Sequence, residues 1–391
     1  MSSVMNRSLI AVVAALAICL PVRAQKLDWK LGFDYLFDNL EFDSSKGIID
    51  PSGTFHAVRL SPEAGLIFAP GEDAHHRVML GVNLFKDLGT QAGPGGVLGE
   101  VTCYYRMDAA LSSGELCFAA GCFPRAISEG DYHGAFFDET YLFEDNNLDG
   151  FLLKYRTESL YAELALDWMG KHGDDAEPAR RERFSILSSG LWNFCGPLSL
   201  GWTGNFYHFA CSQYEKNVID NHTLYPYLRY SPKVYGLDEL SVDFGPVLSY
   251  QRDRSLDERP VLPWGLECNQ KIERKGWIID NRIWWGYDMQ PYRFLGESLL
   301  YPGEPVYHLP VSKPFWADCM LLAYRHPFGS SGFIEAGVVL HFGQKVSEPE
   351  LGIPVFRGWQ QVLAINFNLE KGYRKPRRKA APRTLGELFG I

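Results

Sequence analysis

Alternation of apolar and polar residues is the main signal in this sequence, and the segment Leu27–Asp38 shows it first. Its odd positions, from Leu27 to Phe37, are all apolar or aromatic, whereas most even positions are polar or charged. Because successive side chains of a strand point to opposite faces, this period of two predicts a strand with one apolar and one polar environment. Such a strand fits either a soluble sheet packed on a core or a membrane barrel.

Segments with similar alternation recur along the whole chain. Together with the first they number about sixteen, each near the roughly ten residues that a barrel strand needs. Prolines at positions 62, 226, 246 and 263 weaken four of these predictions, because a proline removes a donor from the strand ladder. The further segments are Phe55–Phe68, Arg77–Phe85, Glu100–Arg106, Leu116–Phe123, Leu148–Arg156, Leu160–Met169, Arg183–Trp192, Leu200–Phe209, Thr223–Tyr230, Leu240–Tyr250, Leu262–Lys271, Trp277–Tyr287, Trp316–Arg325, Phe333–Phe342 and Trp359–Leu369.

The connections between these segments sort by length. Links after even-numbered strands are mostly short, such as Thr157–Ser159 and Glu273–Gly276, although Ser231–Glu239 is longer. Links after odd-numbered strands are long, such as Pro124–Asn147 and Asp288–Phe315. A membrane barrel has short periplasmic turns and long outer loops, whereas a soluble sheet has no reason to sort them. The sorting therefore favours the barrel over a secreted β-sandwich or propeller.

The two ends of the chain differ from the strand region. Arg7, an apolar run over Leu9–Leu20 and the small or apolar residues Val22 and Ala24 predict a signal peptide over residues 1–24, cleaved before Gln25. No later apolar run approaches the roughly 20 residues of a membrane-spanning helix, so spanning must use strands. Residues 371–391 form a basic tail, which could hold anionic lipid or a periplasmic partner, or be a solvated end.

Composition adds three points. The aromatic content of 14%, spread over the whole length, is typical of many segments crossing a lipid–water interface. A net charge of −9 argues against a nucleic-acid partner. The cysteines stand singly, which argues against a zinc site; we expect small apolar strand residues, with a Cys103–Cys117 disulfide as an alternative.

Over nearly its full mature length, the chain resembles the Gram-negative outer-membrane β-barrels, and among them the sixteen-stranded porins. The resemblance rests on the alternation, the loop sorting and a final strand that reads VLAINFNL. It implies an all-β, antiparallel up-and-down transmembrane barrel over residues 25–370, located in the outer membrane. Porins usually end on an aromatic residue of the last strand, whereas here a tail follows from Glu370 to Ile391.

In porins, a long loop after the fifth strand folds into the lumen and narrows it. By resemblance, the carboxylates of the link Pro124–Asn147 would form an acidic constriction that faces cations on the wall and sets selectivity by its field. The alternative is that the loop is solvated outside and the inward charges only fill the lumen with salt bridges. The predicted constriction residues are Glu129, Asp131, Asp138, Glu139 and Asp145, and the predicted pore-lining residues are Lys30, Asp34, Arg59, Glu63, Lys154, Arg156, Glu163, Asp167, Arg229, Arg282 and Glu335.

Two other segments carry candidate chemistry. Asp145–Gly150 matches the start of a calcium-binding loop, but Arg156 stands where the closing carboxylate belongs, so a turn that enters a strand is the favoured interpretation. The link Asp288–Phe315 combines aromatic residues with prolines. Its rings could stack on sugars, plug a pore or pack the loop onto itself.

The leading functional hypothesis is a porin-like channel for small polar solutes, without a cofactor, metal or enzymatic activity. The alternatives are a non-conducting barrel that serves secretion or assembly and, from a third class, an outer-membrane lipid hydrolase, for which no nucleophile motif is found. The solute, the oligomeric state and any periplasmic partner stay open. A charge in place of Leu31 or Phe33 should impair membrane assembly, whereas replacement of Asp34 should alter only what passes.

Overall fold

The computed structural model describes residues 26–42, 52–68, 74–89, 97–170, 182–210, 217–256, 259–292, 294–295, 298–299, 303–346 and 352–371. The predicted signal peptide and the tail beyond residue 371 lie outside the described residues. Those two predictions, with the domain boundaries that depend on them, therefore stay predictions.

The described chain forms a closed barrel of sixteen strands, and each strand is antiparallel to its neighbours. The first strand, β1, pairs with the last, β18, and seals the wall. The prediction of an up-and-down barrel of about sixteen strands is confirmed. The barrel strands are β1 (Lys26–Phe42), β2 (Gly53–Phe68), β3 (Ala74–Asp87), β4 (Leu98–Leu111), β5 (Gly114–Pro124), β6 (Asn147–Arg156), β7 (Leu160–Gly170), β8 (Arg183–Cys195), β9 (Leu198–Phe209), β10 (Ile219–Tyr230), β11 (Glu239–Asp253), β12 (Trp264–Arg274), β13 (Trp277–Gly286), β16 (Phe315–Pro327), β17 (Gly332–Gly343) and β18 (Phe356–Lys371).

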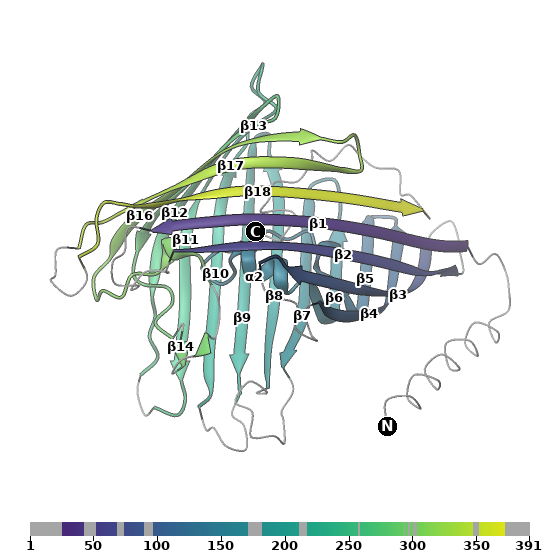
Figure 1. Ribbon diagram of the computed structural model, residues 1–391, viewed down its shortest axis with the longest axis horizontal. Helices are drawn as coiled ribbons and strands as arrows, with labels where there is room; N and C mark the ends of the chain where they lie inside the picture. Colours follow the sequence, from purple (N-terminus) through teal and green to yellow (C-terminus); the bar gives the residue numbers. More distant parts are fainter. Residues whose placement is uncertain are drawn as a thin grey trace.

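The strands are strongly tilted. In Figure 1 the strands β1, β2, β17 and β18 cross the strands β7 to β10 of the opposite wall at a steep angle. Strands inclined by about 40° to the barrel axis produce such a crossing between opposite walls. Apart from the longer link between β10 and β11, the short turns lie at one end of the barrel and the long loops at the other, as predicted; we refer to the long-loop end as the extracellular end.

Each strand presents one polar and one apolar face. In β1 the even positions Asp28, Asp34 and Asp38 are buried inside the barrel, whereas Leu27 and Phe33 are exposed on the outside. The outer surface carries aromatic pairs near both ends of the strands: Trp168 with Phe184 and Trp264 with Trp285 at the extracellular end, Trp192 with Phe194 and Trp277 with Tyr324 at the other. Two such girdles are typical of a barrel that meets a membrane interface at each end.

Three of the four prolines that weakened the strand predictions do lie inside strands of the barrel. Pro62, Pro226 and Pro246 belong to β2, β10 and β11, whereas Pro263 precedes β12. Pro62 has no ladder partner in β3, and Pro226 has none in β11, although each is paired on its other side. The barrel therefore accepts a proline by losing the ladder on one side of the strand, and the strand continues.

Two loops at the extracellular end carry the remaining elements. The β5–β6 loop (residues 125–146) contains η1 (Arg125–Ile127) and the short helix α2 (Glu139–Glu144). The β13–β16 loop (residues 287–314) contains the small hairpin of β14 (Phe294–Leu295) and β15 (Ser298–Leu299), and η2 (Pro305–Tyr307). Among the described residues no helix combines the length and the apolar character that membrane crossing requires.

Candidate functional site: a lumen occupied by two loops

All eleven predicted pore-lining residues lie on the inner face of the wall, alternating with outward apolar positions. Several of them are almost completely buried, including Arg59 and Glu163, each with 3% exposure, and Glu335 with 1%. Lys30 and Arg156 keep more contact with solvent. The inward orientation therefore follows the prediction, but most of these side chains contact other protein groups rather than open water. Their role in solute passage stays a prediction.

The β5–β6 loop is folded into the barrel. Its side chains Phe136, Phe137 and Phe143 are at most 2% exposed and belong to one apolar cluster with wall residues. Phe143 packs edge-on against Phe55 of β2, with ring centroids 5.7 Å apart. In Figure 1 helix α2 correspondingly appears within the outline of the barrel. Of the two interpretations that the sequence left open, the solvated outer loop is therefore wrong.

Glu163 of β7 is the main anchor of this loop. Its carboxylate accepts hydrogen bonds from the backbone N–H groups of Glu129 (2.9 Å) and Gly130 (2.8 Å) and from the Tyr132 hydroxyl (2.6 Å). The hydroxyls of Ser128 and Tyr161 donate to it as well. A Cβ atom at Gly130 would collide with the Glu163 carboxylate, so only glycine lets the loop backbone approach the wall this closely.

Ion pairs hold both ends of the same loop. At its start, Lys154 donates to Glu129 (2.8 Å) and Arg156 also pairs with Glu129. Arg125, within the loop, bridges the wall residue Asp167 (3.1 Å) and Asp145 at the loop end (3.2 Å). Such charge-assisted contacts are stronger than the usual neutral hydrogen bonds, and the Arg125–Asp167 pair is buried on both sides. The loop is therefore fixed along most of its length.

Arg59 of β2 holds the helix end of the loop. Its guanidinium pairs with Asp34 of β1 at 2.9 Å and donates to the backbone carbonyl of Phe143. The same group lies over the Phe143 ring, 4.6 Å from its centroid. Asp34 also accepts a hydrogen bond from Asn366 of β18 (2.6 Å). This hydrogen bond crosses the seam, which is the junction of β1 and β18 that closes the barrel.

The five predicted constriction residues all lie in the inserted loop, but they do different things. Asp138 caps α2 by accepting from the Tyr141 N–H at 2.7 Å, and Asp145 accepts from the Tyr141 hydroxyl at 2.7 Å. Glu129 pairs with the wall, and Asp131 is exposed. Burial, reinforced by surrounding carboxylates, raises the pKa of Glu139 well above its ordinary value. The five carboxylates therefore have different contacts and different tendencies to ionise, whereas an acidic constriction would need them to carry charge together.

The β13–β16 loop also enters the lumen, which the sequence left open. Met289, Val306, Tyr307 and Leu309 are at most 3% exposed and pack in a second apolar cluster with the wall. Tyr307 lies edge-on to the buried Trp284 of β13, with centroids 5.3 Å apart. The described part of this aromatic, proline-rich segment therefore packs against the inner wall of the barrel, and its suggested roles in sugar stacking and pore plugging stay predictions.

The two inner loops meet at one buried carboxylate, Glu267 of β12. His133 of the β5–β6 loop bonds to it through Nε2 at 2.9 Å, and the Tyr307 hydroxyl of the other loop donates to it at 2.5 Å. Because the Ala135 N–H donates to Nδ1 of His133, Nε2 carries the proton toward Glu267. We call His133, Glu267 and Tyr307 the loop lock.

Further contacts join the loops directly. The Gln290 side-chain amide donates to the Ala135 carbonyl (2.9 Å), and the Glu304 N–H donates to the Gly134 carbonyl (2.7 Å). Arg282 of β13, a predicted pore-lining residue, pairs with Glu304. The sequence pattern did not point to the three loop-lock residues or to Glu304. Inward alternation on β12 could have identified Glu267, but no local pattern identifies its partners in the loops.

Below the loops, wall residues pair with one another. Arg77 bridges Asp28 and Asp108, which also accepts from Arg106. The other wall pairs are Arg229 with Asp243 and Arg325 with Glu335, and Glu63 accepts from Thr102 and Tyr104. These contacts therefore join strands of the wall to one another on the inner face.

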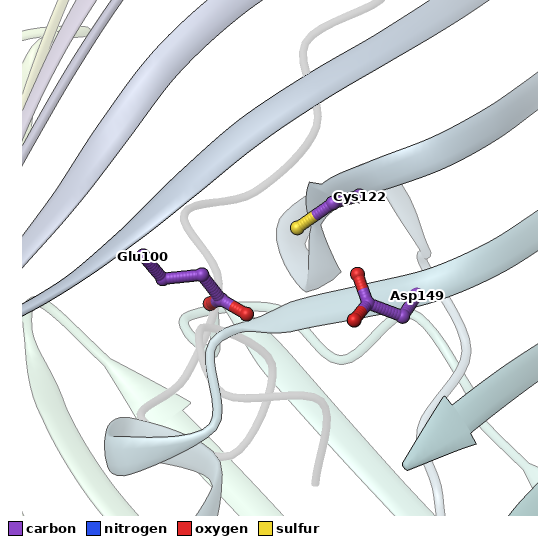
Figure 2. A group of neighbouring side chains, drawn as sticks. All are labelled: Glu100, Cys122 and Asp149. Atoms are coloured by element: carbon purple, nitrogen blue, oxygen red, sulfur yellow. The ribbon is translucent and has the colours of Figure 1, made fainter. Parts of the chain in front are cut away.

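Figure 2 shows Glu100, Cys122 and Asp149, which approach one another from β4, β5 and β6; their ligand-type atoms lie within 4.8 Å of one another. Both carboxylate residues are exposed, so their proximity alone does not indicate an ion. The neighbouring calcium-like segment begins with Asp145, whose carboxylate is already bound to Arg125 and Tyr141. The segment leads into β6, as the turn interpretation predicted.

The described cysteines are all free. Cys103 is exposed on the outer face and pairs across the ladder with Cys122, whereas Cys117 is buried inside and pairs with Asp108. The alternative of a Cys103–Cys117 disulfide is therefore wrong, because the two side chains lie on opposite faces of the wall.

Comparison with known proteins supports the architecture. No family model and no curated protein matches the sequence. Among solved structures, the chain is similar to the in-vitro folded outer-membrane protein OmpT of Vibrio cholerae in its trimer form, with 9% identity, a TM-score of 0.50 and coverage of 89% of this chain and 100% of that chain. It also matches the outer-membrane protein OprD of Pseudomonas aeruginosa, with 10% identity, a TM-score of 0.48 and coverage of 88% and 94%. The fold of this chain is that of the porin-like β-barrels of the outer membrane.

Proposed function

We propose that this barrel is a narrow outer-membrane channel for small polar solutes, and that its two inner loops limit what passes. The observation that carries the proposal is the position of the β5–β6 loop, which lies inside a wall of charged residues and is fixed there by Glu163, Lys154 and Arg125. Charged groups that surround a constriction select solutes by their field as well as by size. The function is transport, without catalysis.

A second candidate is a barrel that does not conduct. It is favoured by the loop lock and by the apolar packing of Tyr307 and Val306, which connect the two loops across the lumen. In that case the barrel would serve as a scaffold for a partner in the envelope. The two candidates differ in whether the β13–β16 loop moves away from the β5–β6 loop.

Passage through the purified protein separates the candidates. The protein would be reconstituted into liposomes and planar bilayers, and sugar-driven swelling and ion conductance would be recorded. The proposal expects a small but definite conductance that increases in a His133→Ala/Tyr307→Ala double variant, because that change opens the lock. A folded barrel that stays impermeable in both forms would exclude the channel and leave the scaffold.

A further inference from the structure

A guanidinium without a partner lies at the extracellular end of the lumen. Arg357, near the start of β18, is 3% exposed. Its Nε and Nη2 atoms are buried and have no hydrogen-bond partner within the part of the chain that the structure describes. The nearest described interaction is with the Phe315 ring, 5.9 Å from the guanidinium carbon to the ring centroid. A buried charge is normally paired, because desolvation makes an unpaired one unfavourable.

Backbone irregularity directs this arginine inward. The ladder between β17 and β18 shifts its register between His341 and Phe342, so that Phe342 pairs with Phe356 and His341 with Gly358. Arg357 is the extra residue of this bulge, and bulges commonly redirect a side chain. The opposing residue Gly343 has no side chain, and a Cβ atom there would collide with the guanidinium. The wall is therefore shaped to hold Arg357 at this place.

The surroundings of Arg357 are mostly apolar. A narrow hollow beside it is lined by Phe42, Val306, Pro305, Phe342 and His341, together with Asp318. Asp318 forms no ion pair with Arg357, and its ladder position opposite the exposed Ile283 places it on the outer face. In this conformation the lining leaves no space for a water molecule, so a ligand requires a small shift of η2.

We propose that Arg357 is the anchor of a binding site for a small oxyanion, such as a carboxylate or a phosphate group. The two unpartnered atoms Nε and Nη2 form one edge of the guanidinium, which presents two parallel N–H donors to a pair of oxygens. The neighbouring His341 interacts with Gln360 at 3.2 Å, and Gln360 in turn donates to Asp38 at 2.7 Å. Glu304, which precedes η2 beside the hollow, is paired with Arg282. Both nearby carboxylates are thus occupied elsewhere, and we infer that an anion from solution is the partner of Arg357.

The position of the Arg357 site fits a role in solute transport. β17 ends and β18 begins at the extracellular end, and η2 of the β13–β16 loop covers the hollow. Pro305 and Val306 of η2 line the hollow and directly precede Tyr307, so an anion bound at Arg357 would lie beside the loop lock. As a solute-capture site this inference rests on the proposed channel function, and it specifies anions as a solute class. Binding itself does not require conduction, so the two can be tested separately.

The test measures anion binding to the folded barrel in detergent. Succinate and inorganic phosphate would be titrated at constant ionic strength by calorimetry into the wild type, Arg357→Gln, Arg357→Lys and the control Arg254→Gln, whose arginine is 53% exposed and pairs with Asp220. We expect the wild type to bind at least one of the two anions. Arg357→Gln should weaken that binding at least tenfold, Arg357→Lys less so, and Arg254→Gln not at all. Which anion binds more tightly distinguishes a carboxylate from a phosphate ligand.

Thermal unfolding without added anion gives a second readout. Because Arg357→Gln removes an unpaired buried charge, it should unfold at the same or a higher temperature than the wild type. The inference is overturned if the wild type binds neither anion, if Arg357→Gln binds as tightly as the wild type, or if this variant is strongly destabilised. Binding without conductance in bilayers would reject the channel and keep the site, and conductance without binding would do the opposite.

Discussion

The two inner loops are held by different kinds of contact. The β5–β6 loop is attached to the wall by buried charged groups near its start, through Asp167 and Glu163, and at its end, through Arg59. The described part of the β13–β16 loop is held by apolar packing and by three polar attachments to the wall, Tyr307 to Glu267, Glu304 to Arg282, and the Met289 carbonyl to the Gln251 side chain. The first loop therefore behaves as part of the wall, and the second is the segment that we expect to move if the channel opens.

The largest expected effect is loss of the Glu163 anchor. Glu163→Ala leaves two backbone N–H groups and up to three hydroxyls without their acceptor, and each buried unsatisfied donor costs about 1–3 kcal/mol. We expect a loss of about 3 kcal/mol or more in the free energy of unfolding, and cleavage of the β5–β6 loop by added protease. Thermal unfolding and mass spectrometry of the fragments would measure both. Glu158→Gln, in an exposed turn, is the control, and a protease-resistant Glu163→Ala loop would contradict the assignment of Glu163 as its main anchor.

Replacement of Asp34 should have the second largest effect on the free energy of unfolding. The sequence suggested that such a change would alter only what passes, but Asp34 is the buried counter-ion of Arg59. Asp34→Asn should therefore destabilise the barrel by about 1–3 kcal/mol, because the guanidinium stays buried with a weaker partner. Asp38→Asn is the matched comparison, since Asp38 is equally buried but accepts from Gln360 rather than from an arginine. Equal unfolding temperatures for the two variants would refute this difference.

A smaller effect is expected from the loop lock. Tyr307→Phe removes one hydrogen bond to Glu267 and keeps the ring packing. A loss of about 1.4 kcal/mol corresponds to about a tenfold change in an equilibrium, so single-channel recordings should show about tenfold more open time, with little change in overall stability. Tyr155→Phe, whose hydroxyl contacts Ser113 at the opposite end of the barrel, should record as the wild type does. An unchanged open time for Tyr307→Phe would mean that the β13–β16 loop does not gate the lumen.

The smallest effect concerns pH. Burial, and then the charges of Asp38, Glu304 and Glu335, raise the pKa of Glu139 in α2, while Arg282 opposes the shift. The neutral form thus favours the docked loop. Its contribution is complete below the ordinary glutamate pKa and is lost as the pH rises through the raised value. Protease sensitivity of the β5–β6 loop should therefore increase at higher pH, and Glu139→Gln should flatten this dependence. A wild-type loop equally protected across that range would disprove the expectation.

The wall could be predicted from the sequence because its pattern is local. Alternation identified all sixteen strands and the inward face of residues such as Asp34 and Glu163, since each position needs only its neighbours. The loop lock could not be predicted in this way, because His133 and Glu267 are 134 positions apart and meet only when a loop folds inward. The inward position of Arg357 could not be predicted either, because strict alternation along β18 would place its side chain outside with Trp359, and only the bulge turns it inward.

The seam between β1 and β18 has a consequence for how the molecule could be rebuilt. Among the described barrel strands, all adjacent pairs except β1 and β18 follow one another along the chain, with only the small β14–β15 hairpin between β13 and β16. Across the seam, Trp29 of β1 faces Lys371 of β18. A short linker between these strands, with a new break in the exposed turn between β10 and β11, would give a circular permutant with the same wall. In that permutant the original seam would form as a simple hairpin, and β10 and β11 would become the long-range closure that has to be made last.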